Sequence, residues 1–419
     1  MAGMTGLRLF IVLMALTLLS ACATLERQPA VPQARRLDAK ILDIPNARFF
    51  SDQVSLMSAE HERSLVREAR RLGIPSGALP TASFLSLSGG GDDGAFGAGL
   101  LVGWTRHGTR PKFKIVTGIS TGALIAPFAF LGSDYDVSLK ALYTETDQSH
   151  IFVRRPFTAA IADDAMADSS PLFATISRHF DDEMMLRIAR EYQNGRLLFI
   201  QTTDLDSGRP VIWNIGAIAA LETYEARNLI RRIILASASV PGAFPPIMFN
   251  VHVENQPHQE MHVDGSAVSQ GFLYPSAVNV RVSDAVTGFH RRRIAYVIRN
   301  ARLHTEWKDV ERQTLAVATK ALSTLINYNG AGDLFRMYIA TKKDGVGFNL
   351  ASIGNDFTQY HSAEFDQTYM RALFAYGYEQ GRAGYPWQKR PPEDTDASAR
   401  SFRAVDHPSV SHSASQAHR

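Results

Sequence analysis

Apolar positions along this chain follow two alternating spacings. Helical spacing marks residues 59–72, where Gly73 and Pro75 end the pattern. Short apolar runs of strand length then appear at 83–88 and 113–116, and each is followed by a glycine-containing turn and a helix-forming run. The order strand, glycine loop, helix, strand, tight turn, helix predicts an α/β fold.

The same alternation continues to about residue 385. Further strands are predicted at 197–203, 211–214 and 294–299, and further helices at 95–104, 123–131, 184–192, 226–238, 315–326 and 364–380. From Pro386 onward Pro, Ser, Asp, Arg and His dominate, which predicts a disordered tail over 386–419. The histidines of this tail (His407, His412 and His418) are irregularly spaced, so neither a metal site nor a cofactor is predicted.

The first segment has the pattern of an export signal. Arg8 precedes the apolar run 9–19, which is too short for a stable membrane anchor. The following Leu-Ser-Ala-Cys resembles the lipobox of bacterial lipoproteins, and this resemblance implies that Cys22, the only cysteine, carries the lipid. Ala23 rather than Asp follows it, which favours a periplasm-facing location at the outer membrane. The predicted organisation is a signal peptide (1–21), a tether with an N-terminal helical segment (22–78), a hydrolase domain (79–385) and the tail.

Charge excludes few classes of partner. The chain has 44 basic and 41 acidic side chains, a formal net charge of +3 that gives no reason to expect a nucleic-acid partner. A hydrophobic content of 45% can build a large core. The partner expected from the leader is instead the membrane itself, to which an acylated Cys22 would anchor the protein.

Ser120 is the candidate nucleophile. It lies in Gly118-Ile119-Ser120-Thr121-Gly122, between a predicted strand and a predicted helix, where glycine neighbours permit the strained turn that presents a serine hydroxyl. The pattern is weak evidence by itself, because an ordinary Gly/Ser turn reads the same way.

A glycine-rich loop stands upstream of this turn. Gly89, Gly90 and Gly91, followed by Asp92, Asp93 and Gly94, lie between a strand and a helix, where successive amides can converge on one negatively charged oxygen. The sequence also matches the dinucleotide pattern G-x-G-x-x-G. The two acids would repel a pyrophosphate, however, and no acid ends a second strand about twenty residues later. An oxyanion hole is therefore the preferred interpretation.

Together these segments resemble the patatin-like phospholipase family. The family combines a glycine loop, a G-x-S-x-G turn and a distant Asp-Gly, here Asp264-Gly265 followed by Ser266, and residues 238–246 look like its segment shortly before the Asp. The resemblance covers about residues 80–280. It implies a three-layer α/β fold with a mostly parallel sheet between helices. It also implies lipid acyl hydrolysis by a Ser120–Asp264 dyad, with Gly89, Gly90 and Gly91 as oxyanion donors and Gly94, Gly118, Gly122 and Gly265 as motif positions.

The chain departs from the family pattern at two positions, and two alternative functions remain open. Asp93 stands where the family often has Arg or Lys, which weakens the case for a phospholipid and favours lipid esters in general, and Ser266 replaces Gly or Ala. An α/β-hydrolase with a Ser-Asp-His triad would need a histidine after the acid, and the candidates are His290, His304 and His361. A non-catalytic lipid-binding lipoprotein on the same fold is the second alternative.

Overall fold

The computed structural model describes residues 25–155, 164–274, 278–303, 309–360 and 363–392. The predicted signal peptide, Cys22, His304, His361 and the three histidines of the tail lie outside these residues. Predictions that concern them therefore stay predictions.

One large sheet organises the described chain. Its main path runs β1-β8-β7-β4-β3-β12-β13, and the β9–β10 hairpin joins it through β7. The five strands from β7 to β13 are parallel, whereas β1, β8, β9 and β10 pair antiparallel. The strands of this sheet are β1 (Arg48–Phe50), β3 (Ala82–Leu87), β4 (Phe113–Gly118), β7 (Leu197–Asp204), β8 (Arg209–Asn214), β9 (Ile247–Val253), β10 (Gln256–Asp264), β12 (Arg293–Arg302) and β13 (Gly347–Ile353). Two short pairs stand apart from it, β2 (Gly77–Ala78) with β11 (Phe289–His290) and β5 (Val153–Arg154) with β6 (Ala167–Asp168).

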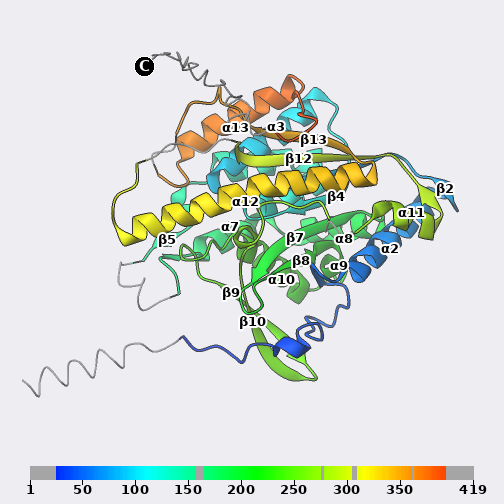
Figure 1. The fold of residues 1–419 in the computed structure, drawn as a ribbon, viewed down its shortest axis with the longest axis horizontal. Coiled ribbons are helices and arrows are strands. Elements are labelled where there is room, and N and C mark those ends of the chain that lie inside the picture. The colour runs from blue at the N-terminus through cyan, green and yellow to red at the C-terminus, as the bar shows by residue number, and fades with distance from the viewer. Residues whose placement is uncertain (1–24, 156–163, 275–277, 304–308, 361–362, 393–419) are drawn as a thin grey trace, which may run out of the picture.

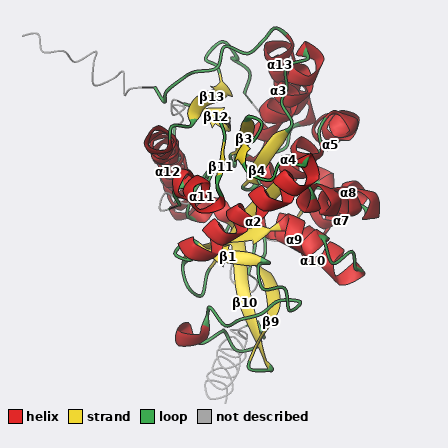
Figure 2. Cartoon of the chain, turned by 90° about the vertical axis from the view of Figure 1, so that its right-hand side faces the viewer, coloured by secondary structure: helices red, strands yellow, loops and turns green. Residues whose placement is uncertain are grey.

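Helices cover both faces of the sheet (Figures 1 and 2). On one side lie α2 (Val54–Leu72), α11 (Val280–Thr287) and α12 (Thr314–Asp344). On the other lie α3 (Gly94–His107), α4 (Thr121–Leu131), α5 (Asp136–Thr144), α7 (Ser170–His179), α8 (Asp182–Gln193), α9 (Ile215–Ala219), α10 (Tyr224–Ser237) and α13 (Gln367–Arg382). The three-layer, mostly parallel α/β fold expected from the sequence is confirmed.

The strands supply two separate cores because successive side chains point to opposite faces. Phe84 and Leu85 are neighbours in β3, yet Phe84 belongs to the core beneath α12, and Leu85 to the core beneath α3 and α4. Buried on both faces, β3, β4, β7 and β12 read as nearly continuous apolar runs, which is why they could be recognised in the sequence; β13 was not predicted.

The β9–β10 hairpin was not predicted. Its two-residue turn is Glu254-Asn255, with φ of 49° and 64°, the double positive φ of a type I′ turn. Glu-Asn lacks the glycine that usually marks such a turn, and polar residues fill much of β10. Sequence periodicity therefore gave no strand signal in a segment that ends on Asp264.

Both ends of the described chain pack more closely than expected. The predicted tether lies beside the hairpin (Figure 1), where Arg27 pairs with Asp206 and Lys40 bridges to His252. Beyond residue 385 the ring of Trp387 lies 4.8 Å from that of Trp104. The packed chain thus runs past the boundary predicted at 385, because one aromatic residue in a polar segment suffices to dock it.

Candidate active site

Ser120 occupies a sharp turn between β4 and α4. Its φ of 55° is strained for a residue with a side chain. A methyl group on Gly118 would strike the Gly122 carbonyl, and one on Gly122 would strike the Leu87 carbonyl. Glycine at both flanks is therefore a steric requirement of this turn, as the sequence pattern predicted.

A serine from α10 accepts a hydrogen bond from the backbone of this turn. The Ser120 amide donates to Ser237 Oγ at 3.0 Å, and Ser237 Oγ donates to the Gln201 carbonyl at 2.7 Å. Ser237 was not identified from the sequence, although it directly precedes the 238–246 segment that carried part of the family resemblance. The backbone of Ser120 is thus held in its strained conformation by α10 and β7, two elements distant in sequence.

The glycine loop meets the Ser120 turn at two points. A methyl group on Gly89 would lie 3.2 Å from Ser120 Cβ, so the two residues are neighbours. Gly94 lies against Thr121, because a methyl group there would strike Thr121 Oγ1. Gly94 opens α3 and Thr121 opens α4, so two helix N-termini meet beside Ser120. Their partial positive charges favour a negative charge at this place.

The amides of the loop differ in what they can still bind. The Gly89 amide donates to the Gln270 carbonyl at 3.1 Å, which corrects its assignment as a free oxyanion donor. Within the described chain the amides of Gly90 and Gly91 donate to no acceptor. Gly90 has a φ of 156°, and a methyl group on it would strike the Asn300 carbonyl. Only Gly90 and Gly91 of the three predicted donors are available.

Asn300, at the end of β12, clamps the loop. Its Nδ2 donates to the Ser88 carbonyl at 2.8 Å, its amide donates to Ser88 Oγ at 2.8 Å, and its Oδ1 accepts from the Gly97 amide at 3.1 Å. Asn300 is fully buried. The only sequence signal was its place two residues after the apolar run of β12, where polar residues of parallel sheets gather.

The two acids of the loop tie it to the α13 side of the molecule. Asp92 is buried and accepts from the Phe365 amide at 3.0 Å, and Asp93 accepts from the Tyr369 hydroxyl at 2.5 Å. Burial and the neighbouring Asp93 raise the pKa of the Tyr369 hydroxyl, and Arg302 nearby lowers it by less. Asp93 therefore connects the loop to α13 through Tyr369.

Asp264 ends β10 and is 1% exposed. Its Oδ1 accepts from the Ser266 amide at 2.7 Å, whereas Oδ2 is buried and has no hydrogen-bond partner within the described chain. Burial raises the pKa of Asp264 to about 6, although the Ser120 hydroxyl and the Ser266 amide lower it. The Ser120 hydroxyl therefore lies near the carboxylate, although no hydrogen bond of ordinary geometry joins it to Oδ2.

The backbone of Asp264 is held by hydrogen bonds on both its amide and its carbonyl. Its amide donates to the Ser239 carbonyl at 2.8 Å, and its carbonyl accepts from Thr203 Oγ1 at 3.0 Å. Gly265 is required next to it, because a methyl group there would lie 2.6 Å from the Gln201 carbonyl oxygen. The Asp-Gly of the sequence is thus a strand end held between two neighbours rather than a surface turn.

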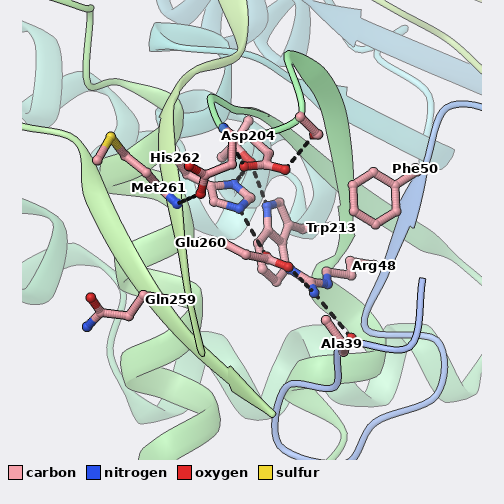
Figure 3. Close-up of polar contacts among 12 residues, drawn as sticks. Ala39, Arg48, Phe50, Asp204, Trp213, Gln259, Glu260, Met261 and His262 are labelled. Atoms are coloured by element: carbon pink, nitrogen blue, oxygen red, sulfur yellow. Dashed lines mark hydrogen bonds and ion pairs between the residues drawn. The ribbon is translucent and has the colours of Figure 1, made fainter. Parts of the chain in front are cut away.

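A buried polar network supports the strand that carries Asp264 (Figure 3). Arg48 on β1 forms an ion pair with Glu260 on β10, and Glu260 contacts His262 Nε2 at 3.3 Å. His262 Nδ1 lies 2.8 Å from Thr202 Oγ1, which also accepts from Trp213 Nε1 at 2.8 Å. This network joins β1, β8, β7 and β10, and because it is two residues from Asp264 it fixes the register of that strand end.

The described histidines do not complete a triad. His262 is fully buried and both its ring nitrogens have partners in the network, neither of which is Ser120 or Asp264. His290 is exposed on β11, a strand outside the main sheet. Of the three triad candidates, only His290 lies within the described residues.

These features place the protein among α/β proteins that present a serine on a strand-turn-helix elbow. Residues 85–274 match the model of the Patatin-like phospholipase family, so this part of the chain is similar to that family. The matched stretch contains Ser120, Asp264 and the whole glycine loop. This match supports the hydrolysis of lipid esters as the general activity.

The other comparisons add little to this assignment. The crystal structure of VipD from Legionella pneumophila is similar at a TM-score of 0.33 and 12% identity, over 74% of this chain and 66% of that one. The chain therefore spans just under two thirds of VipD. No curated protein matches this sequence.

Proposed function

We propose that this protein is a serine lipid acyl hydrolase in which Ser120 is the nucleophile and Asp264 its base. The observation that carries the proposal is the unpartnered, buried Oδ2 of Asp264 beside the Ser120 hydroxyl. A buried carboxylate oxygen normally has a hydrogen-bond partner, and leaving one without costs stability. Such a cost is expected where the oxygen must be free to take a proton.

In the first half-reaction, Asp264 Oδ2 takes the proton of Ser120 while Ser120 Oγ attacks the ester carbonyl carbon. The C=O electron pair moves onto oxygen and gives a tetrahedral oxyanion. The amides of Gly90 and Gly91 and the N-terminus of α4 would stabilise this charge. The intermediate then collapses, the C–O bond to the alcohol breaks, and the alcohol leaves with the proton from Asp264.

In the second half-reaction, water replaces the alcohol. Asp264 takes a proton from water as the water oxygen attacks the acyl-enzyme carbonyl. The new oxyanion collapses, Ser120 Oγ leaves and recovers its proton from Asp264, and the free fatty acid departs. The proton balance closes without histidine, which is consistent with the absence of a histidine beside this pair among the described residues.

The substrates proposed are carboxylic esters of lipids, with neutral lipids preferred over anionic ones. The loop from Gly89 to Gly94 contains two carboxylates and no basic side chain that could bind a phosphate. We expect diacylglycerol to be hydrolysed faster than phosphatidylglycerol. Both should be presented in the same vesicles with a constant fraction of non-hydrolysable ether-linked phosphatidylglycerol, which keeps the surface charge equal. A clear preference for the anionic ester would refute this specificity.

We also propose that an acylated Cys22 anchors the protein at the outer membrane, facing the periplasm. The support is the Leu-Ser-Ala-Cys sequence behind a short apolar run. Such an anchor would keep the hydrolase next to membrane lipid.

A fluorophosphonate probe tests the nucleophile. We expect the probe to label the wild type, to fail on Ser120→Ala, and to label Ser55→Ala, a control that removes an exposed serine from α2. Fluorophosphonates react only with activated serines, so loss of labelling in one variant identifies the activated hydroxyl.

Each alternative gives a different result in the same experiment. A wild type that takes no label and hydrolyses no lipid ester would favour the non-catalytic lipid-binding lipoprotein. Labelling at Ser120 that is lost together with turnover in a variant of His290, His304 or His361 would favour a Ser-Asp-His triad.

A further inference from the structure

The long helix α12 is apolar on both sides, but only one side is covered. Leu334 and Met337 are buried in the core beneath the sheet. On the opposite side Leu325, Tyr328 and Ile339 are 63%, 68% and 64% exposed, and Val317 and Phe335 are also exposed. At roughly 100° per residue these five positions fall within about 80° of the circumference. A helix that is apolar all round is normally buried all round.

The charges beside this stripe all have one sign. Arg336, Lys342 and Lys343 are exposed and border it. The two acids of α12, Asp333 and Asp344, are both buried, and Asp333 forms an ion pair with Arg336, which leaves Lys342 and Lys343 as the main source of positive charge beside the stripe. An exposed apolar stripe edged only by cations is the pattern of a helix that lies in the interface of an anionic membrane. Within the described chain no helix is long and apolar enough to cross a membrane, so a role parallel to the surface fits better than a span.

The inner side of α12 adjoins the candidate active site. Asp333 accepts from the Gln270 amide at 2.6 Å, and the Gln270 carbonyl accepts from the Gly89 amide at 3.1 Å. A methyl group on Gly330 would lie 3.1 Å from Gln270 Cγ. Only Gln270 therefore separates α12 from the glycine loop that touches Ser120. Figures 1 and 2 show α12 lying along the outside of the sheet.

We propose that the outer face of α12, defined by Val317, Leu325, Tyr328, Phe335 and Ile339 with Arg336, Lys342 and Lys343, docks onto an anionic lipid surface. This docking brings the glycine loop and Ser120 to the bilayer from which the ester is taken. The inference rests on the proposed function for its purpose, but the docking itself can be measured without turnover. It concerns the surface that the helix recognises and is independent of the head group that the site accepts.

A single fluorophore reports docking at a chosen position. Because Cys22 is the only cysteine, Cys22→Ser combined with Leu325→Cys leaves one thiol for an environment-sensitive dye. The matched control carries the dye at Val137→Cys, which is 81% exposed on α5. Both proteins also carry Ser120→Ala, so that no lipid is consumed. We expect a blue shift at position 325 with vesicles of phosphatidylcholine and phosphatidylglycerol, a much weaker one with phosphatidylcholine alone, and none at position 137.

Two results would overturn the proposal. One is no shift at position 325, or an equal shift at position 137. The other is a shift at position 325 that grows with protein concentration without vesicles, which would mean that a second copy of the chain covers the face.

Kinetics then separate docking from chemistry. Tyr328→Gln with Ile339→Gln should lower kcat/KM on anionic vesicles tenfold or more, and leave hydrolysis of a water-soluble short-chain ester unchanged. Val282→Gln with Val286→Gln, which removes two exposed apolar residues of α11, should change neither rate. Equal loss on both esters would contradict docking by this face. A wild type inactive on both esters would instead remove the proposed function and leave the fluorescence result standing.

Discussion

Ser120→Ala is expected to lower kcat by about 10⁴-fold or more on any lipid ester that the wild type hydrolyses. The variant keeps Cβ and the strained backbone but removes the only atom proposed to bond to the acyl group. Pre-steady-state kinetics with a chromogenic ester in excess over the enzyme should also lose the burst that marks accumulation of an acyl-enzyme. Retention of a tenth of the activity would show that Ser120 is not the nucleophile.

Ser120→Gly provides the matched control for stability. Glycine adopts a φ of 55° without strain, so the free energy of unfolding of Ser120→Gly should be about 1 kcal/mol larger than that of Ser120→Ala. Both variants should be equally inactive. Chemical denaturation of the two variants measures the difference. A glycine variant no more stable than the alanine variant would mean that the turn is not strained.

Asp264→Asn is expected to lower kcat/KM by roughly 10³-fold, because the amide cannot take the Ser120 proton. In the wild type, the base must be ionised in order to act. With a pKa of about 6 for Asp264, kcat/KM should fall about tenfold per pH unit below 6 and level off above it. A profile controlled by an ionisation near 7 that moves in a histidine variant would contradict the dyad.

The same substitution is expected to stabilise the folded protein at neutral pH. Burial raises the pKa of Asp264 from 3.8 to about 6, so ionisation in the folded state is unfavourable by about 3 kcal/mol relative to the unfolded chain. This penalty is fully present above pH 6 and disappears as the pH falls toward 3.8. Asp264→Asn should therefore exceed the wild type in unfolding free energy at pH 7.5, and the gap should close by pH 4. If the difference in unfolding free energy between the variant and the wild type did not narrow at low pH, ionisation of Asp264 would not be its cause.

The fold could be predicted where burial is one-sided or complete. The strands β3, β4, β7 and β12 are buried on both faces and appear as apolar runs, and their helices follow at the expected places. The β9–β10 hairpin and the docked N-terminal segment could not be predicted, because polar residues there form pairs between segments that are far apart in sequence. No local periodicity reports such pairs.

The candidate site divides in the same way. The glycines around Ser120 are local steric requirements, so the pattern G-x-S-x-G predicts them. The support from Asn300, Ser237 and Gln270 comes from three other segments, and no pattern around Ser120 predicts which residues of those segments contact the site. The difference between Gly89, whose amide is occupied, and Gly90, whose amide is free, likewise depends on where the Gln270 carbonyl lies.

The sequence alone determined which residues can carry the chemistry: a serine that requires glycine neighbours, a run of glycines and an Asp-Gly, in the order of a known family. Those steric requirements arise within a few residues of backbone, so a short stretch of sequence is enough to reveal them. Only the tertiary structure decided that Asp264 is buried with one oxygen unpartnered, that two rather than three loop amides are free, and that the inner side of α12 lies one residue away from the glycine loop while its outer face is uncovered. Burial and partner choice depend on how distant segments meet, and that is settled by packing rather than by any single stretch of the chain.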